Sequence, residues 1–360
     1  MIRQHLTEYA ELPVVEFLDT GAEESLLRSA ANRARRAGEE PPASTPHRGL
    51  MEAAKEEPGS VAWRLRLSSY SEEFVPYLAR FVEEVDTTRV RALVIGDWGF
   101  EDGSDLSSRD LRDALIGHAE AFPELRSLFV GDVTFEENEI SWIQQCDLAP
   151  LLAAYPRLEE LAVRGVGDTH SGGGTLSLNV PEHRALRSLT VQSGGLPGRL
   201  VREVLSSGLP ALERLELWLG VDHYGGDTTP EDLAPLLSGK ALPALRHLGL
   251  RNSQRTGAWV RALAEAPVTS RLSSLDLSLG SLRNRDTEHL LAAVPAFAHL
   301  ESLDLHHHYL GEENTERVRA ALTGAGVRVD LSDRKGDGGD DEDTGDEAED
   351  DYDYYPAVGE

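Results

Sequence analysis

Apolar residues recur in one fixed pattern along most of the chain. The pattern is a leucine, two residues, a leucine, one residue, and then a leucine or valine. Two variants begin at Ala62 and Val90, and seven clear copies follow at Leu125, Leu158, Leu186, Leu212, Leu245, Leu272 and Leu300. From Val90 onward the copies begin 26 to 35 residues apart. A repeat of this length indicates a solenoid, in which each coil adds one layer to a continuous core.

Each copy predicts a short β-strand with one buried face, because apolar and polar residues alternate within it. Successive parallel strands need a crossover connection, which is usually helical. Amphipathic helical patterns fill most connectors, at residues 107–121, 200–205, 230–237, 258–264, 287–294 and 315–322. The sequence therefore predicts an α/β solenoid over residues 60–332. We expect a right-handed horseshoe with a parallel concave sheet and a mostly helical convex side.

The repeats and their long helical connectors resemble the ribonuclease-inhibitor-like class of leucine-rich repeats over residues 61–331. The chain is also similar to a family of cytoplasmic bacterial leucine-rich-repeat proteins, through segments 140–145 (Ile-Ser-Trp-Ile-Gln-Gln) and 186–195. This resemblance implies the horseshoe fold and brings no activity with it. The chain departs from the class at the ninth repeat position, usually Asn or Cys, which holds Val133, Val166, Gly194, Gly220, Ser253, Gly280 and His308. We therefore expect irregular loops at that corner.

The two ends of the chain differ from the repeats in composition. Residues 1–20 include a strand-like stretch at 11–18, and we expect them to cap the open end of the core. Residues 21–59 carry few core residues and predict a disordered linker or insertion. Residues 333–360 contain 13 Asp or Glu against Arg334 and Lys335 and predict a disordered acidic tail. Alternatively, the tyrosines of this tail form a short motif that docks on a basic partner.

Charge and cysteine content narrow the range of functions. The 360 residues carry a formal net charge of −28, which argues against non-specific binding to nucleic acid or to an anionic membrane. Cys146 is the single cysteine, so neither an internal disulfide nor a thiolate zinc site can form. The sequence has no apolar run of secretory type, and no stretch approaches the roughly 20 apolar residues of a membrane span. We expect a soluble, monomeric cytoplasmic protein.

A metal site is one hypothesis for the histidine run at residues 306–308, which follows Asp304. Neighbouring strand residues point to opposite faces, so three adjacent histidines cannot easily converge. Asp304 and His306 share the concave face, and Asp276 on the adjacent strand is placed to complete a site. A second acidic group, formed by Asp97, Glu101, Asp132, Glu136 and Glu137, predicts a solvated rim, since it matches no established calcium-loop spacing.

Catalytic motifs are missing from the sequence. It contains no nucleophile with an identifiable base, no phosphate loop, no G-x-S-x-G elbow and no H-E-x-x-H pair. We therefore expect a protein that is not an enzyme and that needs no cofactor.

The repeat register predicts which side chains face the hollow of the horseshoe. On the middle and late strands these are Arg214, Glu216, Trp218, His247, Arg251, Asp276, Asp304 and His306, hereafter the concave patch. Exposed Trp and Arg are the residue types that dominate interface hot spots. The alternative is a solvated sheet face with ordinary charge pairs, with Trp218 folded over the rim onto apolar loop residues.

These observations favour a protein–protein interaction scaffold that uses its concave face. The acidic charge predicts a basic or mixed-charge protein partner. The alternative is a metal- or ligand-dependent accessory protein for a neighbouring enzyme, with Asp276, Asp304 and His306 as the site.

Overall fold

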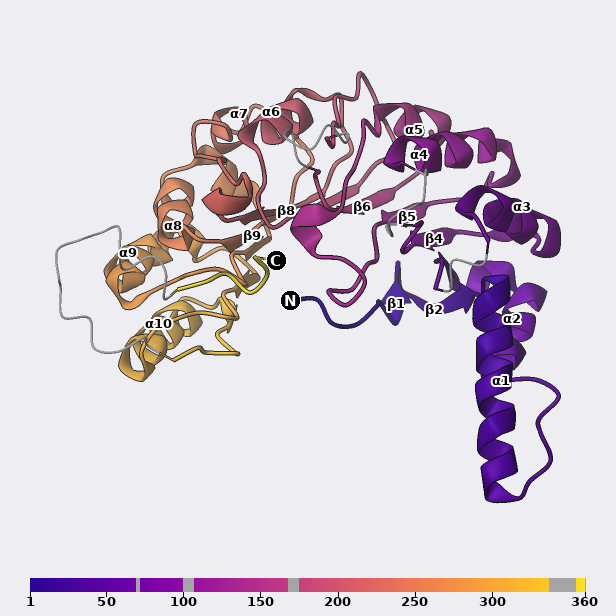
Figure 1. Cartoon of the computed structure of the whole chain (residues 1–360). Coiled ribbons are helices and arrows are strands. Elements are labelled where there is room, and N and C mark those ends of the chain that lie inside the picture. Colours follow the sequence, from indigo (N-terminus) through magenta and orange to yellow (C-terminus); the bar gives the residue numbers. More distant parts are fainter. Residues whose placement is uncertain (69–71, 100–106, 168–174, 337–353, 360) are drawn as a thin grey trace.

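The computed structural model describes all residues except 69–71, 100–106, 168–174, 337–353 and 360. The described residues form one 12-stranded sheet whose strands follow the order of the chain. All neighbouring strands pair in parallel except β1 and β2, which are antiparallel. Figure 1 shows the sheet bent into an arch with the helices along its outer side. The prediction of an α/β, leucine-rich-repeat-like solenoid is thus confirmed.

Strands β3 to β11 coincide with the nine copies of the repeated pattern, and β1, β2 and β12 lie outside it. They are β1 (Glu8–Tyr9), β2 (Leu12–Phe17), β3 (Ala62–Leu65), β4 (Ala92–Ile95), β5 (Ser127–Val130), β6 (Glu160–Arg164), β7 (Ser188–Gln192), β8 (Arg214–Gly220), β9 (His247–Ser253), β10 (Ser274–Asp276), β11 (Ser302–Asp304) and β12 (Arg328–Asp330). The same repeat position pairs with itself from strand to strand, as in Leu189, Leu215 and Leu248. These leucines are fully buried, and each contributes roughly 1.5–3 kcal/mol by leaving water.

The outer helices fill the connectors between strands. They are α3 (Phe74–Glu84), α4 (Ser108–Gly117), α5 (Ala149–Ala154), α6 (Gly198–Ser206), α7 (Ala234–Leu237), α8 (Thr256–Ala264), α9 (Thr287–Phe297) and α10 (Glu312–Gly324). In α6 the buried stripe is Leu200, Val201 and Val204, which faces the leucines of the sheet. Helix α7 is shorter than its pattern predicts, because residues 230–233 form a turn in which the Asp232 N–H donates to the Thr229 carbonyl.

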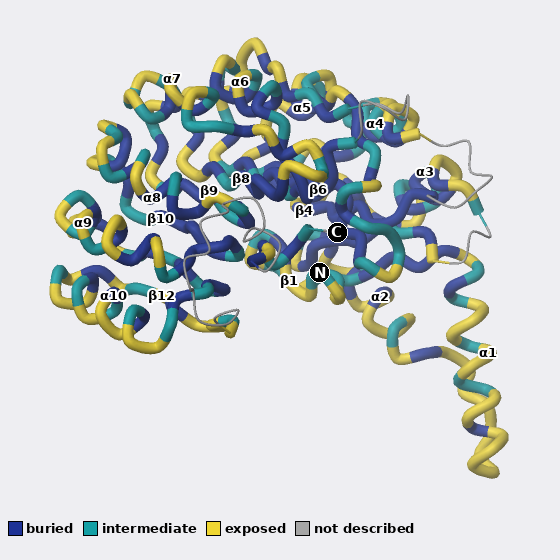
Figure 2. The backbone as a smooth tube through the Cα atoms, turned by 60° about the vertical axis from the view of Figure 1, so that its left-hand side comes forward, coloured by how far each residue is buried: buried dark blue, intermediate teal, exposed yellow. Residues whose placement is uncertain are grey.

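Residues 21–59 differ from the disordered linker that their composition favours, because they form helices α1 (Thr20–Ala37) and α2 (Pro46–Glu56). Asp19 Oδ1 caps α1 by accepting the Ala22 N–H at 2.7 Å. Helix α2 buries Met51 and Ala54 in the solenoid core, whereas α1 projects from the end of the arch with mostly exposed residues (Figure 2). Few apolar residues are needed to pack this insertion on the solenoid, because only a narrow face of it contacts the core.

The N-terminal segment extends the sheet and also folds back over it. Strand β2 pairs in parallel with β3, so it forms the first coil. Tyr9 of β1 then packs on the concave side against Phe129, with the two ring centroids 5.9 Å apart. Leu6 and Leu12 contact the same cluster, which includes Ala62, Ala92, Val94 and Ala162 of strands β3 to β6. Residues 6–12 therefore cover the inner face of the first strands.

The C-terminal end also returns to the concave side. Residues 354–359, hereafter the C-terminal segment, lie near the N-terminus inside the arch (Figure 1). The Met1 amine donates a 2.7 Å hydrogen bond to the Ala357 carbonyl. For these residues the structure differs from the disordered acidic tail that composition favours, and residues 337–353 lie outside the described part of the chain. Among the described helices, none has the length and apolar character that a membrane crossing requires.

Candidate interaction surface on the concave face

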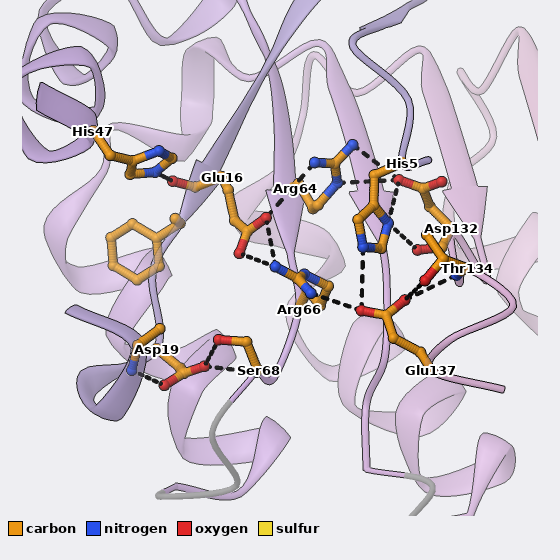
Figure 3. A network of polar contacts seen from close by, with 12 residues as sticks. His5, Glu16, Asp19, His47, Arg64, Arg66, Ser68, Asp132, Thr134 and Glu137 are labelled. Carbon is orange, nitrogen blue, oxygen red and sulfur yellow. Dashed lines mark hydrogen bonds and ion pairs between the residues drawn. The ribbon is translucent and has the colours of Figure 1, made fainter. Parts of the chain in front are cut away.

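A network of ion pairs occupies the concave side of the first strands (Figure 3). Arg64 of β3 donates from Nε to Asp132 Oδ2 at 3.0 Å, and its Nη1 lies 3.6 Å from Glu16 Oε2. Arg66 pairs with Glu137 at 2.6 Å and with Glu16 at 3.0 Å. Arg64 and Arg66 occupy positions that the repeat register assigns to the hollow. Their charges are compensated internally, so this part of the concave face offers little to a partner.

His5 links the N-terminal segment to this network. Its Nδ1 lies 3.0 Å from the Asp132 carbonyl oxygen, and its Nε2 lies 3.1 Å from Glu137 Oε1. Burial opposes the charged ring, but its hydrogen bonds to Asp132 and Glu137 outweigh burial and raise the pKa of His5 to about 9. Burial likewise opposes ionisation of Glu137, but the hydrogen bonds from His5, Thr134 and Arg66 lower its pKa to about 2. His5 is therefore a half-buried cation at neutral pH.

The predicted acidic rim is only partly a solvated surface, because Glu136 is exposed and Glu137 is half-buried, whereas its two aspartates are covered. Asp132 and Asp97 are buried. Asp97 Oδ1 accepts the Gly99 backbone N–H, and Asp132 pairs with Arg64. Glu101 lies outside the described residues. Sequence patterning could not reveal the burial, because the residues that cover Asp132 come from strand β3 and from the N-terminal segment.

The second half of the sheet carries the concave patch, with Arg251 at its centre. Trp218 of β8 and Arg251 of β9 are neighbours in register. Arg251 Nη1 lies 3.2 Å from Glu216 Oε2, and its Nε lies 3.1 Å from Asp276 Oδ2. The guanidinium carbon stands 5.3 Å from the centre of the Trp218 ring. The structure thus brings the β8, β9 and β10 members of the patch together, as the register predicted.

The carboxylates of the patch have different environments. Burial opposes ionisation of Glu216, but the hydrogen bond from His247 and the charges of Arg251 and Arg214 lower its pKa to about 2. For Asp276, burial outweighs the opposite charge of Arg251 and raises the pKa. Arg214 is the exposed member, with 48% of its side chain accessible. The patch therefore presents alternating charge on a face that remains partly open to solvent.

Trp218 is placed differently from the exposed position that the register predicts. It is 7% exposed and packs in an apolar cluster with Ile140 and Val358, against which Ile2 also lies. Among the described residues, its buried indole Nε1–H has no hydrogen-bond acceptor. Trp218 is therefore covered by residues from both ends of the chain. The sequence around Trp218 does not indicate this burial, because Ile2 and Val358 lie more than a hundred positions away along the chain.

The histidine run lies beyond the end of β11, at a corner where His307 has a positive φ of 59°, so strand alternation does not apply to it. His308 is buried and its Nε2 lies 3.2 Å from the Leu331 carbonyl, whereas His306 Nδ1 lies 2.8 Å from Asp304 Oδ1. Potential ligand atoms of Asp304, His306 and Asp330 lie within 4.8 Å of one another. Asp330 on β12 takes the place that the sequence hypothesis gave to Asp276, which instead pairs with Arg251.

Solved structures include one that is similar to this chain over most of its length. A crystal structure of a protein from Bacteroides fragilis matches 96% of this chain and 88% of that chain, with 27% identity and a TM-score of 0.71. The complex of TLR13 with ssRNA13 matches 76% of this chain and 33% of that chain, with 13% identity and a TM-score of 0.34. No family model matches the sequence, and no curated protein does. The first likeness spans most of both chains and shows a shared fold.

Proposed function

We propose that this protein is a non-enzymatic interaction scaffold that binds another protein on the concave face of its solenoid. The single observation that carries the proposal is the partly open concave patch over strands β8 to β11. A curved solenoid offers a large inner surface, and interaction is the use to which such surfaces are commonly put. The same proposal takes the solenoid as right-handed and the protein as a monomer in the bacterial cytoplasm.

The charges of the patch define the partner. The patch holds three carboxylates (Glu216, Asp276 and Asp304), two arginines (Arg214 and Arg251) and two histidines (His247 and His306), so its charge is mixed. Asp330 adds a further carboxylate at the end of the sheet. A segment of basic or mixed charge complements this surface, and its association weakens as salt screens the exposed charges.

Charge reversal at Arg214 tests the proposal. Proteins captured from the native host by the wild-type chain are identified by mass spectrometry, purified and titrated by calorimetry. We expect Arg214→Glu to change the partner's Kd by about tenfold, the scale of a single interface charge. Arg202→Glu is the matched control, because its side chain is 60% exposed on α6 and also pairs with one carboxylate. If both variants bind the partner as tightly as the wild type does, the concave patch is not part of the interface.

A metal-dependent accessory protein is the second candidate, favoured by the grouping of Asp304, His306 and Asp330. Imidazole nitrogen and carboxylate oxygen together suit first-row divalent metals. Elemental analysis of gently purified protein tests this function. One stoichiometric ion that disappears in His306→Ala supports the site, whereas metal-free protein that binds no added Zn²⁺ or Mn²⁺ excludes it.

A further inference from the structure

The C-terminal segment is held against the concave side by main-chain hydrogen bonds. The Val358 N–H donates to Asn252 Oδ1 at 2.9 Å, and Asn252 Nδ2 donates back to the Val358 carbonyl. The Ala357 N–H donates to the Leu279 carbonyl at 2.9 Å. Asn252 is fully buried, and its backbone adopts a left-handed φ of 53°. The Asn252 amide pairs with both the backbone N–H and the backbone carbonyl of Val358. This pairing recognises the main chain of a docked segment, whatever side chain that residue carries.

Two side chains of the segment occupy separate subsites. Val358 is buried against Trp218 and Ile140. Four positions earlier, the buried ring of Tyr354 contacts Tyr309 edge-to-face, with centroids 5.1 Å apart, and Arg283 stands 4.5 Å from its centre. These contacts select an aromatic residue and an aliphatic residue at this spacing, between which the main chain is held.

The surface beneath the segment is shaped for close approach of a main chain. A Cβ on Gly194 would lie 2.7 Å from the Gly359 carbonyl oxygen, so a larger residue there would push the segment away. The fit is nevertheless incomplete. The buried Trp218 Nε1–H, which has no acceptor among the described residues, reduces the net gain from docking.

Tethering explains how such a contact persists. The segment belongs to the same chain as the solenoid, so its docking is intramolecular, and such tethering typically gives an effective concentration on the order of 1 mM. An intramolecular contact of modest affinity is therefore formed most of the time. A free ligand with the same contacts can still replace it when that ligand binds tightly enough.

We propose that the surface around Asn252 is a groove for an extended peptide segment that carries an aromatic residue and, four positions later, an aliphatic one. The chain's own C-terminal segment is the resident occupant, and a segment of the partner protein replaces it. This inference deepens the proposed function and depends on it for the identity of the partner. The existence of the groove can be tested without that partner.

The test uses full-length protein and a fluorescent peptide of residues 352–360 (Tyr-Asp-Tyr-Tyr-Pro-Ala-Val-Gly-Glu). In the variant Val358→Asp, a charge must enter the apolar subsite at Trp218, so the resident segment is released. Fluorescence anisotropy is expected to show peptide binding to this variant at least about tenfold tighter than to the wild type, whose groove is occupied. A scrambled peptide of the same composition is the control and should not bind.

The variant Asn252→Gly, added to Val358→Asp, removes the amide clamp. Glycine tolerates the left-handed backbone, so the loss reports the side chain rather than strain. We expect peptide affinity to fall at least about tenfold. A well-folded Val358→Asp protein that binds the peptide no better than the scrambled control would overturn the groove, as would an Asn252→Gly variant of undiminished affinity.

Hydrogen exchange of the wild-type protein provides a test that needs no variant. We expect the amides of Ala357 and Val358 to exchange more slowly than unstructured peptide, and full-rate exchange at both would refute docking. The experiments distinguish a failure of the groove proposal from a failure of the scaffold proposal. Peptide binding without any captured protein contradicts the scaffold alone, whereas a captured partner whose Kd is unchanged by Asn252→Gly and Val358→Asp contradicts the groove alone.

Discussion

The charge on His5 depends on two carboxylates, Asp132 and Glu137, which reach it from the loop after β5. Burial alone would disfavour the imidazolium, yet these partners raise the pKa of His5 to about 9. Glu137 responds in the opposite sense, and its pKa falls to about 2. Proton linkage then gives each residue a pH range in which it stabilises the fold. The shared range, between the ordinary pKa of Glu and that of His, lies from about pH 4.5 to pH 6.5.

The pH dependence of stability is the prediction at this scale. Because the folded-state pKa of His5 is raised, its stabilisation is complete below about pH 6.5 and is lost as pH rises through about 9. Urea titrations at pH 6 should show that His5→Ala lowers the free energy of unfolding by on the order of 2 kcal/mol, with a smaller difference at pH 10. The exposed His223→Ala is the control and should change little. A His5→Ala difference that stays constant from pH 6 to 10 would contradict this assignment.

Side-chain packing and ion pairs, in addition to backbone pairing, hold strands β2 and β3 at the end of the sheet. Phe17 and Trp63 build an aromatic core with Phe81 of α3. On the opposite face, Arg64 connects β3 to Asp132 after β5 and to Glu16 of β2. Ion pairs buried to this degree contribute little over an apolar contact, but removal of one partner leaves a costly unpaired charge.

Replacement of Arg64 is the prediction at the scale of elements. Arg64→Met removes both guanidinium contacts to Asp132 Oδ2 and leaves this buried carboxylate only the more distant His5 and Arg164, so we expect a loss of about 3 kcal/mol in the free energy of unfolding. Arg187→Met is the matched control, because Arg187 pairs with Glu213 at 2.6 Å while both side chains are at least half exposed. That change should cost less than about 1 kcal/mol. Chemical denaturation of both variants measures the difference between their losses of unfolding free energy. Similar losses would show that the buried Arg64 pair stabilises the fold no more than an exposed pair does.

The whole molecule is an arch whose two ends meet inside its hollow (Figure 1). Ile2 and Val358 both contact the cluster of Trp218 and Ile140, and the Met1 amine hydrogen-bonds to Ala357. The concave face is therefore divided in three: the N-terminal segment covers the first strands, the C-terminal segment covers Trp218, and the charged patch around Arg251 remains partly open. This arrangement places the proposed groove beside the proposed charged interface.

Coupling between the two ends is the prediction for the whole molecule. In a double-mutant cycle, Ile2→Asp and Val358→Asp disrupt one shared cluster, so their effects on unfolding free energy should be non-additive by at least about 0.5 kcal/mol. The control cycle pairs Val358→Asp with Leu50→Asp, whose side chain is exposed on α2. That pair should add within about 0.3–0.5 kcal/mol. Additivity in both cycles would show that the ends do not share a cluster.

The repeat register could be obtained from the sequence because it depends on local alternation. Leu215 and Leu248 occupy the same repeat position, and a shift by one residue would turn every buried leucine toward solvent. The same logic placed Trp218 beside Arg251. The composition of residues 21–59 did not predict helices α1 and α2, because a helix that contacts the core through a narrow face needs few apolar residues.

The sequence by itself determined the solenoid, the order of its strands and the side chains that belong to each face. Only the tertiary structure decided which of those side chains are accessible. Asn252 and Val358 are 106 positions apart, and His5 and Asp132 are 127 apart, so no local pattern connects either pair. Both contacts form because the sheet curves and brings the two chain ends into its hollow. The chain ends that fold into the hollow decide which concave side chains are accessible, whereas the repeat itself decides which side chains are buried within each coil.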